Sequence, residues 1–298
     1  MAQVVLAVDI GGTKLAAGRV DGGGVLTDQR AVPTPAGGTA AELWDVLDGL
    51  VSSVGQGDEA VVGVGCGGPM EPGGATVSPL NVPAWRGFPL RDRLGALTGL
   101  SVHIDNDAKA LALGEGWVGA ARGVRNYIAM VVSTGVGGGI VLDGRLLDGA
   151  TGNAGHIGHV IVEPGGRICA CGAQGCLEAE ASGLAIEAIT GRSPTEPTYE
   201  IMQRTGRLVG RAAASICNLL DLDLVVVGGA VALGFAATFF NAAQEELSTS
   251  ARLPYSRQAR ITPTRLGDRA PLIGAGAVGI RGWSRDRSRS ARKGVAAR

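Results

Sequence analysis

The sequence predicts an α/β fold that is divided into two lobes. Short apolar runs alternate with segments of helical periodicity, as in α/β proteins. A unit of strand, glycine turn and strand at the start of the chain recurs near its middle. The 298 residues suffice for about two domains, and the 45% hydrophobic content can bury a sizeable core. The 50 glycines gather where expected strands end. Their positions are therefore the main evidence for where a ligand would bind.

The first half of the chain contains a strand, glycine turn and strand, followed by alternating helices and strands. The residues Leu43, Leu47 and Leu50 recur on one face of an expected helix. Short runs of apolar residues bounded by glycine and polar residues indicate strands. Strands are expected at 4–9, 15–20, 60–64 and 102–104, and helices at 40–54 and 108–121.

The second half repeats this style. Strands are expected at 127–133, 140–142 and 222–227, with a helix ending near Leu220. From Ser284 to Arg298 the chain carries six Lys or Arg residues between Ser and Ala, which suggests a basic disordered tail. The expected domains are a small lobe of residues 1–115 with about 270–283, a large lobe of 116–269, and the tail 284–298.

Composition excludes several classes of function. Lys plus Arg and Asp plus Glu each total 27, so no net charge draws the protein to nucleic acid or to an anionic membrane. No apolar run approaches the roughly 18 residues of a spanning helix. The chain enters its first strand directly after Met1-Ala2-Gln3 without a basic leader. We therefore expect a cytoplasmic protein with neither nucleic-acid nor membrane partners.

The first glycine turn is Asp9-Ile10-Gly11-Gly12-Thr13-Lys14. Without a Cβ atom, glycine lets backbone N–H groups approach an anion, and Thr13 adds a hydroxyl donor. Asp9 offers the carboxylate oxygen that Mg²⁺ prefers. An ordinary hairpin with a satisfied acid explains this turn equally well.

The second turn, Ser133 to Gly139, contains more glycine than a simple reversal of the chain requires. An apolar strand rather than a helix is expected after Gly139, which argues against a dinucleotide-binding fingerprint. The sequence also lacks a G-x-x-x-x-G-K-[ST] phosphate loop. Paired glycine turns in two lobes favour an actin-like nucleotide cleft.

A cluster of soft ligands lies between the expected strands of the second half. It comprises His159, Cys169, Cys171 and Cys176, which suit tetrahedral Zn²⁺ in a closed, structural site. Adventitious or redox-active cysteines are the alternative. Cys66 and Cys217 have apolar neighbours and are expected to be buried fillers.

These motifs together resemble the ROK family (repressor, open reading frame, kinase) from Asp9 to about Gly279. The two glycine turns resemble its phosphate motifs, and Cys169-x-Cys171-Gly-x-x-Gly175-Cys176-Leu-Glu178 resembles its zinc signature. The resemblance implies an actin-like, two-lobed hexokinase (ASKHA) fold with a central cleft, ATP with Mg²⁺, and transfer to a sugar 6-hydroxyl in a homodimer or homotetramer. Polyphosphate stays open as a donor. The implied ATP-binding residues are Asp9, Gly11, Gly12, Thr13, Lys14, Thr134, Gly135, Gly137, Gly138, Gly228 and Gly229.

Asn106-Asp107 resembles the sugar-binding pair of the family, whose aspartate accepts the proton of the attacking hydroxyl. A carboxylate between a strand and a helix can be aimed rigidly, which supports this role. Taken alone, Asp107 could equally cap the helix. The further sugar contacts that the resemblance implies are Gly68, Asn81, His159 and Glu178, with His159 serving zinc and sugar through its two ring nitrogens.

The sequence departs from the family motif at one position that bears on sugar specificity. Many members have Glu-x-Gly-His where this chain has His156-Ile157-Gly158-His159. Imidazole cannot match the bidentate acceptance of a carboxylate, so preference at the sugar C2 should change. The Gly-His-Ile-Gly-His form is similar to that of bacterial N-acetylmannosamine kinases. N-acetylmannosamine is therefore the leading expected substrate and glucose the next.

Two other functions were weighed against a kinase. A repressor of the same family carries an amino-terminal helix-turn-helix, for which a first strand beginning by residue 4 leaves no room. A sugar sensor without turnover would need neither both glycine turns nor Asp107. The sequence therefore favours a kinase.

Overall fold

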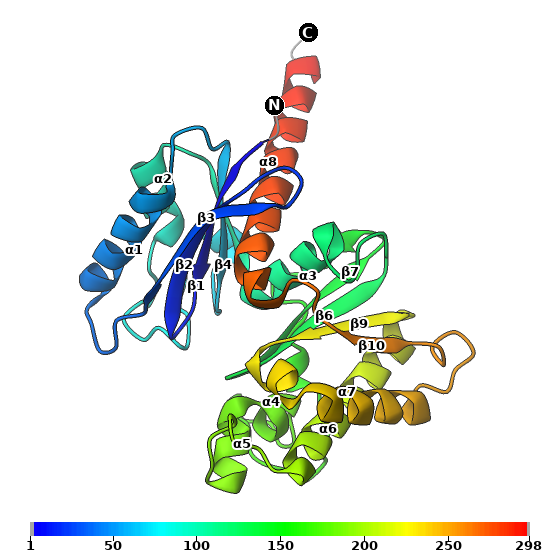
Figure 1. Cartoon of the computed structure of the whole chain (residues 1–298). Helices are drawn as coiled ribbons and strands as arrows, with labels where there is room; N and C mark the ends of the chain where they lie inside the picture. The colour runs from blue at the N-terminus through cyan, green and yellow to red at the C-terminus, as the bar shows by residue number, and fades with distance from the viewer. Residues whose placement is uncertain (1–2, 297–298) are drawn as a thin grey trace. The chain divides into compact units, whose positions relative to one another are not determined.

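The computed structural model describes residues 3–296, with the backbone alone for Arg289 and residues 292–296. The chain forms two compact units. Unit 1 comprises Met1–Val118 and Asp268–Arg298, and unit 2 comprises Gly119–Gly267. Each unit has its own five-stranded sheet (Figure 1). Within residues 3–296, no helix is both long and apolar enough to cross a membrane.

The sheet of unit 1 has the strand order β3-β2-β1-β4-β5. Strands β1, β2 and β3 are antiparallel neighbours, whereas β1, β4 and β5 run parallel. Because parallel strands end at the same edge of a sheet, the residues that follow Ile10, Cys66 and Asn106 lie at one edge. The bounds are β1 Val5–Ile10, β2 Lys14–Val20, β3 Leu26–Pro33, β4 Val61–Cys66 and β5 Val102–Asn106.

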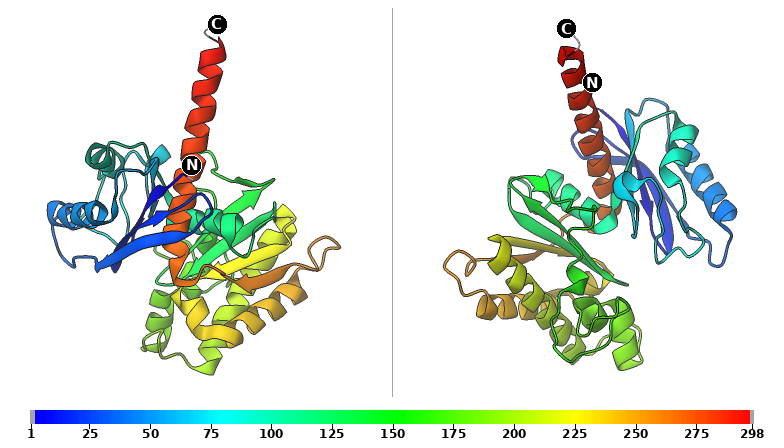
Figure 2. Two further views of the ribbon diagram at one scale, coloured as in Figure 1. Left: turned by 45° about the horizontal axis from the view of Figure 1, so that its top comes forward. Right: turned by 180° about the vertical axis from the view of Figure 1, so that it is seen from behind.

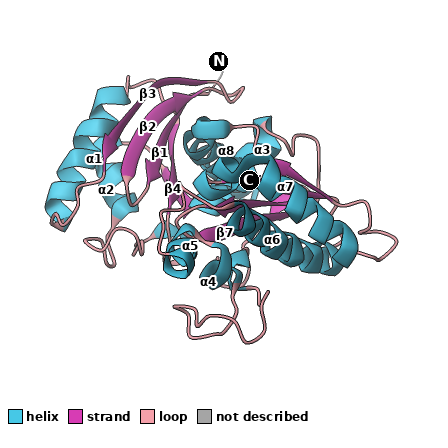
Figure 3. Cartoon of the chain, turned by 60° about the horizontal axis from the view of Figure 1, so that its bottom comes forward, coloured by secondary structure: helices cyan, strands magenta, loops and turns pink. Residues whose placement is uncertain are grey.

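Strand alternation distributes β1 between two layers of helices. Leu6 and Val8 pack in the core formed with α1 (Ala40–Val54) and α2 (Leu90–Thr98). Ala7 faces the other way, into a cluster with Leu272 of α8 (Ala270–Ala296). Figure 3 shows α1 and α2 along one face of this sheet and α8 with α3 (Asp107–Val118) along the other.

Glycines bring α8 into close contact with its neighbours in unit 1. A Cβ at Gly274 would lie 2.7 Å from the Ala110 carbonyl carbon of α3. A Cβ at Gly279 would lie 3.1 Å from Cα of Gly63 in β4. Both distances are below ordinary van der Waals contact, so only glycine permits this approach.

The expected disordered tail is wrong for the described residues, because α8 runs from Ala270 to Ala296 (Figure 2). The error came from reading arginine-rich composition as disorder, although Arg and Ala are strong helix formers. Contacts within unit 1 also support the helix beyond Ser284. Asp286 lies 3.2 Å from Nε2 of His103, and Arg287 lies 4.5 Å from the Trp283 ring centroid. Residues 297–298 of the expected tail lie outside the described residues.

The sheet of unit 2 has the order β10-β9-β6-β7-β8. Strands β6, β9 and β10 are parallel, and β7 pairs antiparallel with both β6 and β8. Buried residues such as Ile128 and Met130 pack with the helices in one core. The bounds are β6 Tyr127–Val132, β7 Val136–Leu142, β8 Arg145–Leu146, β9 Leu224–Gly228 and β10 Arg260–Pro263.

Two long helices, α6 and α7, pack side by side in unit 2 (Figure 2). A Cβ at Gly206 of α6 would overlap the carbonyl oxygen of Phe239 in α7, so glycine sets the distance between these helices. The bounds of the helices are α4 Leu177–Ala181, α5 Gly183–Thr190, α6 Tyr199–Leu220 and α7 Ala230–Ser250, with short 3₁₀ turns at Pro72–Gly74, Ile157–His159 and Gly267–Arg269.

The second glycine turn is shorter than expected. Strand β7 begins at Val136, so Gly137 and Gly138 pair with Val131 and Met130 inside the sheet. A Cβ at Gly138 would lie 3.0 Å from Cγ2 of Ile157 and 3.1 Å from the Gly155 oxygen. Gly138 therefore makes room for the loop that crosses β7, and the expected strand start at residue 140 is wrong.

Candidate functional site

The candidate site residues form two sets, one in each unit. In unit 1, Asp9 pairs in register with Gly65 of β4, and Gly65 pairs with Asp105 of β5. A Cβ at Gly65 would lie 3.6 Å from Oδ1 of Asp9 and 3.9 Å from Cα of Asp107. Asp9 and Asp107 therefore lie on either side of Gly65, at the carboxyl edge of the parallel strands.

The carboxyl group of Asp9 is a weaker acid than an ordinary aspartate. Its pKa is raised from 3.8 to about 7, first because burial disfavours the charged carboxylate and second because Asp107 is nearby. Lys14 partly opposes this increase. A divalent cation would offset both causes, so the two carboxylates suit Mg²⁺.

Asn106 and Asp107 form the junction between β5 and α3. Oδ1 of Asn106 accepts a hydrogen bond from the Ala108 N–H at 3.0 Å, and Oδ1 of Asp107 lies 2.8 Å from the same nitrogen. Asn106 therefore fills the capping position, while Asp107 is the first residue of the helix. A Cβ at Gly68 would lie 3.7 Å from Nδ2 of Asn106, which places Gly68 beside this pair.

The first glycine turn is a hairpin between β1 and β2. The Gly11 N–H donates to the Lys14 oxygen at 3.0 Å, so this amide is engaged within the turn. The Thr34 N–H donates to the Thr13 oxygen at 3.0 Å. A Cβ at Gly12 would lie 2.6 Å from Cβ of Asn81. The structure therefore joins the first turn to the candidate sugar residue Asn81.

In unit 2, Glu178 contacts the turn between β6 and β7. Oε2 of Glu178 accepts a hydrogen bond from the Val136 N–H at 3.0 Å, and a Cβ at Gly135 would lie 3.0 Å from the same oxygen. The Ser133 oxygen, beside Thr134, accepts from the Gly183 N–H at 2.7 Å. A candidate sugar residue thus holds a candidate phosphate turn, which the sequence spacing of 42 residues did not indicate.

The third glycine pair joins β9 to α7. Gly228 ends the strand, and Gly229 precedes the helix with a φ of +98°. A Cβ at Gly229 would overlap the Val132 carbonyl, so both conformation and space require glycine. The N–H groups of the first turn of α7 follow directly, an arrangement that suits an anion.

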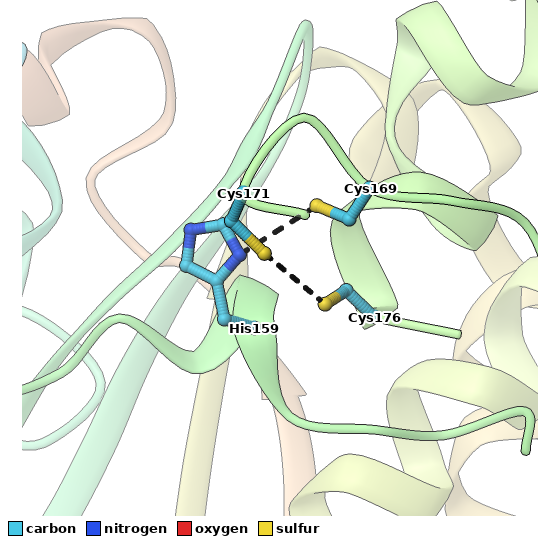
Figure 4. Close-up of side chains that lie close together, drawn as sticks. All are labelled: His159, Cys169, Cys171 and Cys176. Atoms are coloured by element: carbon cyan, nitrogen blue, oxygen red, sulfur yellow. Dashed lines mark hydrogen bonds between the residues drawn. The ribbon is translucent and has the colours of Figure 1, made fainter. Parts of the chain in front are cut away.

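The four expected metal ligands lie together (Figure 4). Their donor atoms all lie within 4.8 Å of one another. Sγ of Cys171 lies 3.7 Å from Sγ of Cys176, and Sγ of Cys169 lies 3.8 Å from Nδ1 of His159. Two sulfurs at about 2.3 Å from a tetrahedral zinc ion are about 3.8 Å apart. The donor set therefore fits Zn²⁺, and 3.7 Å is too long for a disulfide.

The loop of residues 160–176, which we term the zinc loop after its candidate ligands, follows directly on His159. His159 directs Nδ1 toward Cys169, which leaves Nε2 on the other side of the ring. The ring centroids of His156 and His159 are 6.0 Å apart, with both side chains exposed. A Cβ at Gly158 would lie 3.3 Å from Cβ of Glu178, so Glu178 belongs to the same cluster.

Two acidic residues near these sites were missed by sequence reasoning. Asp105 bonds to Lys109 of α3, and Glu180 holds the zinc loop through the Arg167 N–H at 2.5 Å. Arg204 of α6 also donates, through Nη1, to the backbone carbonyl oxygen of Glu180 at 2.7 Å. The spacing of four residues between Asp105 and Lys109 was the sequence signal for the first network.

Comparisons with known proteins show what this chain is similar to. The ROK family model matches residues 5–281. An N-acetylmannosamine kinase of Citrobacter koseri is 39% identical over 243 residues, covering 76% of this chain and 83% of that protein. A ROK glucokinase structure from Streptomyces griseus, in complex with glucose and AMPPNP, has a TM-score of 0.80 and 30% identity, covering 94% of this chain and 100% of that one. A ROK hexokinase from Thermus thermophilus has a TM-score of 0.80 and 32% identity, covering 95% and 99%.

These likenesses confirm the expected fold class, the actin-like α/β fold of ROK sugar kinases. The family match spans nearly the whole chain and includes all of the candidate residues. The chain belongs to the ROK family.

Proposed function

We propose that this chain is an ATP-dependent sugar kinase that phosphorylates the 6-hydroxyl of N-acetyl-D-mannosamine. The observation that carries the proposal is its 39% identity over 243 residues to an N-acetylmannosamine kinase. The pair Asn106-Asp107 at the carboxyl end of β5 supports the same activity.

In this proposal Asp107 is the general base. It accepts the proton of the sugar hydroxyl while the new O–P bond forms and the bond between the γ-phosphorus and the β,γ-bridging oxygen breaks, releasing ADP. Bound Mg²⁺ would neutralise phosphate charge, and Asp9 is the residue placed to hold it. The turns at Gly12-Thr13 and Thr134-Gly135 would supply N–H donors to phosphate oxygens.

The sugar-binding residues in this proposal are those that the family resemblance implies, together with His156. They are Gly68, Asn81, Asn106, His156, His159 and Glu178. A structural zinc ion would fix the imidazole of His159 through Nδ1 so that Nε2 meets the sugar. We also propose a homodimer or homotetramer, as the sequence resemblance implies, and a cytoplasmic location.

Replacing Asp107 tests the proposed base. Asp107→Asn keeps the side-chain volume but cannot accept the proton, so kcat should fall by about 10²-fold or more. Sugar binding, measured by calorimetry, should change by less than about fivefold. Asp45→Asn, on the exposed face of α1, is the matched control. Unchanged turnover in Asp107→Asn would show that another group is the base.

A coupled assay of ADP release tests the substrate. Glucose, mannose, N-acetylglucosamine and N-acetylmannosamine are compared by kcat/KM, with N-acetylmannosamine expected to exceed glucose by at least tenfold, or about 1.4 kcal/mol. His156→Glu should restore carboxylate binding of sugar hydroxyls and shift the ratio toward glucose. A tenfold preference of the unmodified chain for glucose would contradict the assignment of N-acetylmannosamine as substrate. The assignment as a sugar kinase would still hold.

A further inference from the structure

An ionic network surrounds Asp105, the residue directly before the pair Asn106-Asp107. Oδ1 of Asp105 accepts from the Asn106 N–H at 2.9 Å and from Nζ of Lys109 at 2.9 Å. Oδ2 lies 3.3 Å from Nη1 of Arg281 in α8. One carboxylate therefore joins the end of β5, the first turn of α3 and the carboxyl-terminal helix.

The network is largely shielded from water. The side chains of Lys109, Asp105 and Arg281 are 4%, 16% and 18% exposed. Ionic hydrogen bonds in such an environment are stronger than exposed ones, and removing one member leaves an uncompensated charge. The arrangement is therefore stiff, as well as costly to break.

The helix that supplies Arg281 is fixed in place by close contacts. Gly274 and Gly279 bring α8 against α3 and β4, and Gly282 brings it against the His103 ring in β5. A side chain at any of these glycines would push the helix away from the sheet. Arg281 consequently reaches Asp105 from a backbone with little freedom to shift.

We propose that Asp105 is a positioning residue for phosphoryl transfer, held by Arg281 and Lys109, and that α8 thereby fixes the catalytic turn. The proposal rests on the function assigned above to Asp107. Asp105 bonds to the backbone N–H of the residue before Asp107 and to the side chain of the residue two positions after it, so it links the two sides of Asp107. A misplacement of about 1 Å at a reacting group can cost about 10²-fold in rate.

Kinetics and hydrogen exchange on the full chain test this role together. Asp105→Asn keeps an acceptor for the Asn106 N–H but loses the charge that holds Lys109 and Arg281, and Arg281→Ala removes only the link to α8. We expect kcat to fall at least tenfold in both variants, with KM for sugar and ATP changed less than threefold. Guanidinium ion at tens of millimolar should restore part of kcat in Arg281→Ala alone.

Hydrogen exchange gives a readout that does not depend on activity. Amides of residues 106–109 should exchange at least tenfold faster in both variants, while those of β1 and α1 keep their protection. Arg287→Ala, which removes an exposed arginine of the same helix, is the matched control and should change neither rate nor exchange.

The outcomes separate this proposal from the proposed function. Unchanged exchange at 106–109 in Arg281→Ala overturns the positioning role, as does a kcat within twofold of the unmodified chain. An unmodified chain that phosphorylates none of the four sugars would refute the kinase assignment, and exchange would still decide whether Asp105 and α8 hold the turn. If Asp105→Asn fails to fold, the kinetics of Arg281→Ala and its rescue by guanidinium ion decide whether the positioning role holds.

Discussion

At the scale of single residues, the buried carboxyl group of Asp9 lowers the stability of the fold near neutral pH. Its carboxyl group is buried near Asp107, and its pKa rises from 3.8 to about 7. The folded state therefore holds this proton more tightly than the unfolded chain. The resulting penalty is absent below pH 4, grows between pH 4 and 7, and is fully present above pH 7. A bound divalent cation would remove it.

We therefore predict that Asp9→Asn stabilises the metal-free protein at pH 8 by on the order of 1–4 kcal/mol. The stabilisation should shrink as the pH falls and vanish near pH 4, because both forms are then neutral. Urea unfolding at pH 4, 6 and 8 measures this, with Asp45→Asn as the control for loss of an exposed carboxylate. A variant less stable than the unmodified chain at pH 8 contradicts the raised pKa.

At the scale of elements, the zinc loop is bonded to a carboxylate that is not one of the four candidate metal ligands. Glu180 of α4 is 2% exposed and accepts from the Arg167 N–H, two residues before Cys169. It also pairs with Arg204 of α6. Glu180 thus ties the loop that carries two cysteines to the helical layer of unit 2.

We predict that Glu180→Gln weakens zinc binding by about 10–100-fold, as loss of an outer partner does at other metal sites. Competition with a chromophoric chelator measures the affinity. Glu187→Gln, an exposed acid on neighbouring α5, should leave it unchanged. Equal zinc affinity in both variants would mean that the cysteines and His159 order the loop by themselves.

The same scale shows what the sequence could and could not predict. Helix α1 was predicted at its observed bounds, Ala40–Val54, because its apolar spacing is a local signal. The metal ligands were predicted because four rare residues lie in eighteen positions. Strand β7 was misplaced because Gly138 makes room for the loop at Gly155, a contact that no local pattern reveals. The Glu180 network was missed because its partners Arg167 and Arg204 are distant in the sequence, and the Asp105 network was missed because its link to Arg281 is distant too.

At the scale of the whole molecule, the chain consists of two units with separate hydrophobic cores. Each unit also contains its own buried ionic network. In unit 1, the 7% exposed side chain of Arg19 pairs with Glu59 and lies 2.7 Å from Asp58. In unit 2, the buried side chain of Glu180 pairs with Arg204 and accepts from the Arg167 N–H. A perturbation of either network should therefore affect the stability of its own unit first.

Calorimetry tests this division with one perturbation in each unit. We expect two unfolding transitions, one for each unit. Removal of zinc by a chelator should lower the Tm of one of them by about 10 °C, if about 3 kcal/mol of stability is lost and each kcal/mol shifts Tm by about 2–4 °C. Arg19→Met leaves Glu59 buried without its cation, a loss of about 3–5 kcal/mol, and should lower the other transition. When zinc removal and Arg19→Met are combined, each transition should shift by the amount that its own perturbation causes alone. The zinc site and Arg19 share no partners, so their effects should be independent. One transition that responds equally to both would show that the units unfold as a single cooperative body.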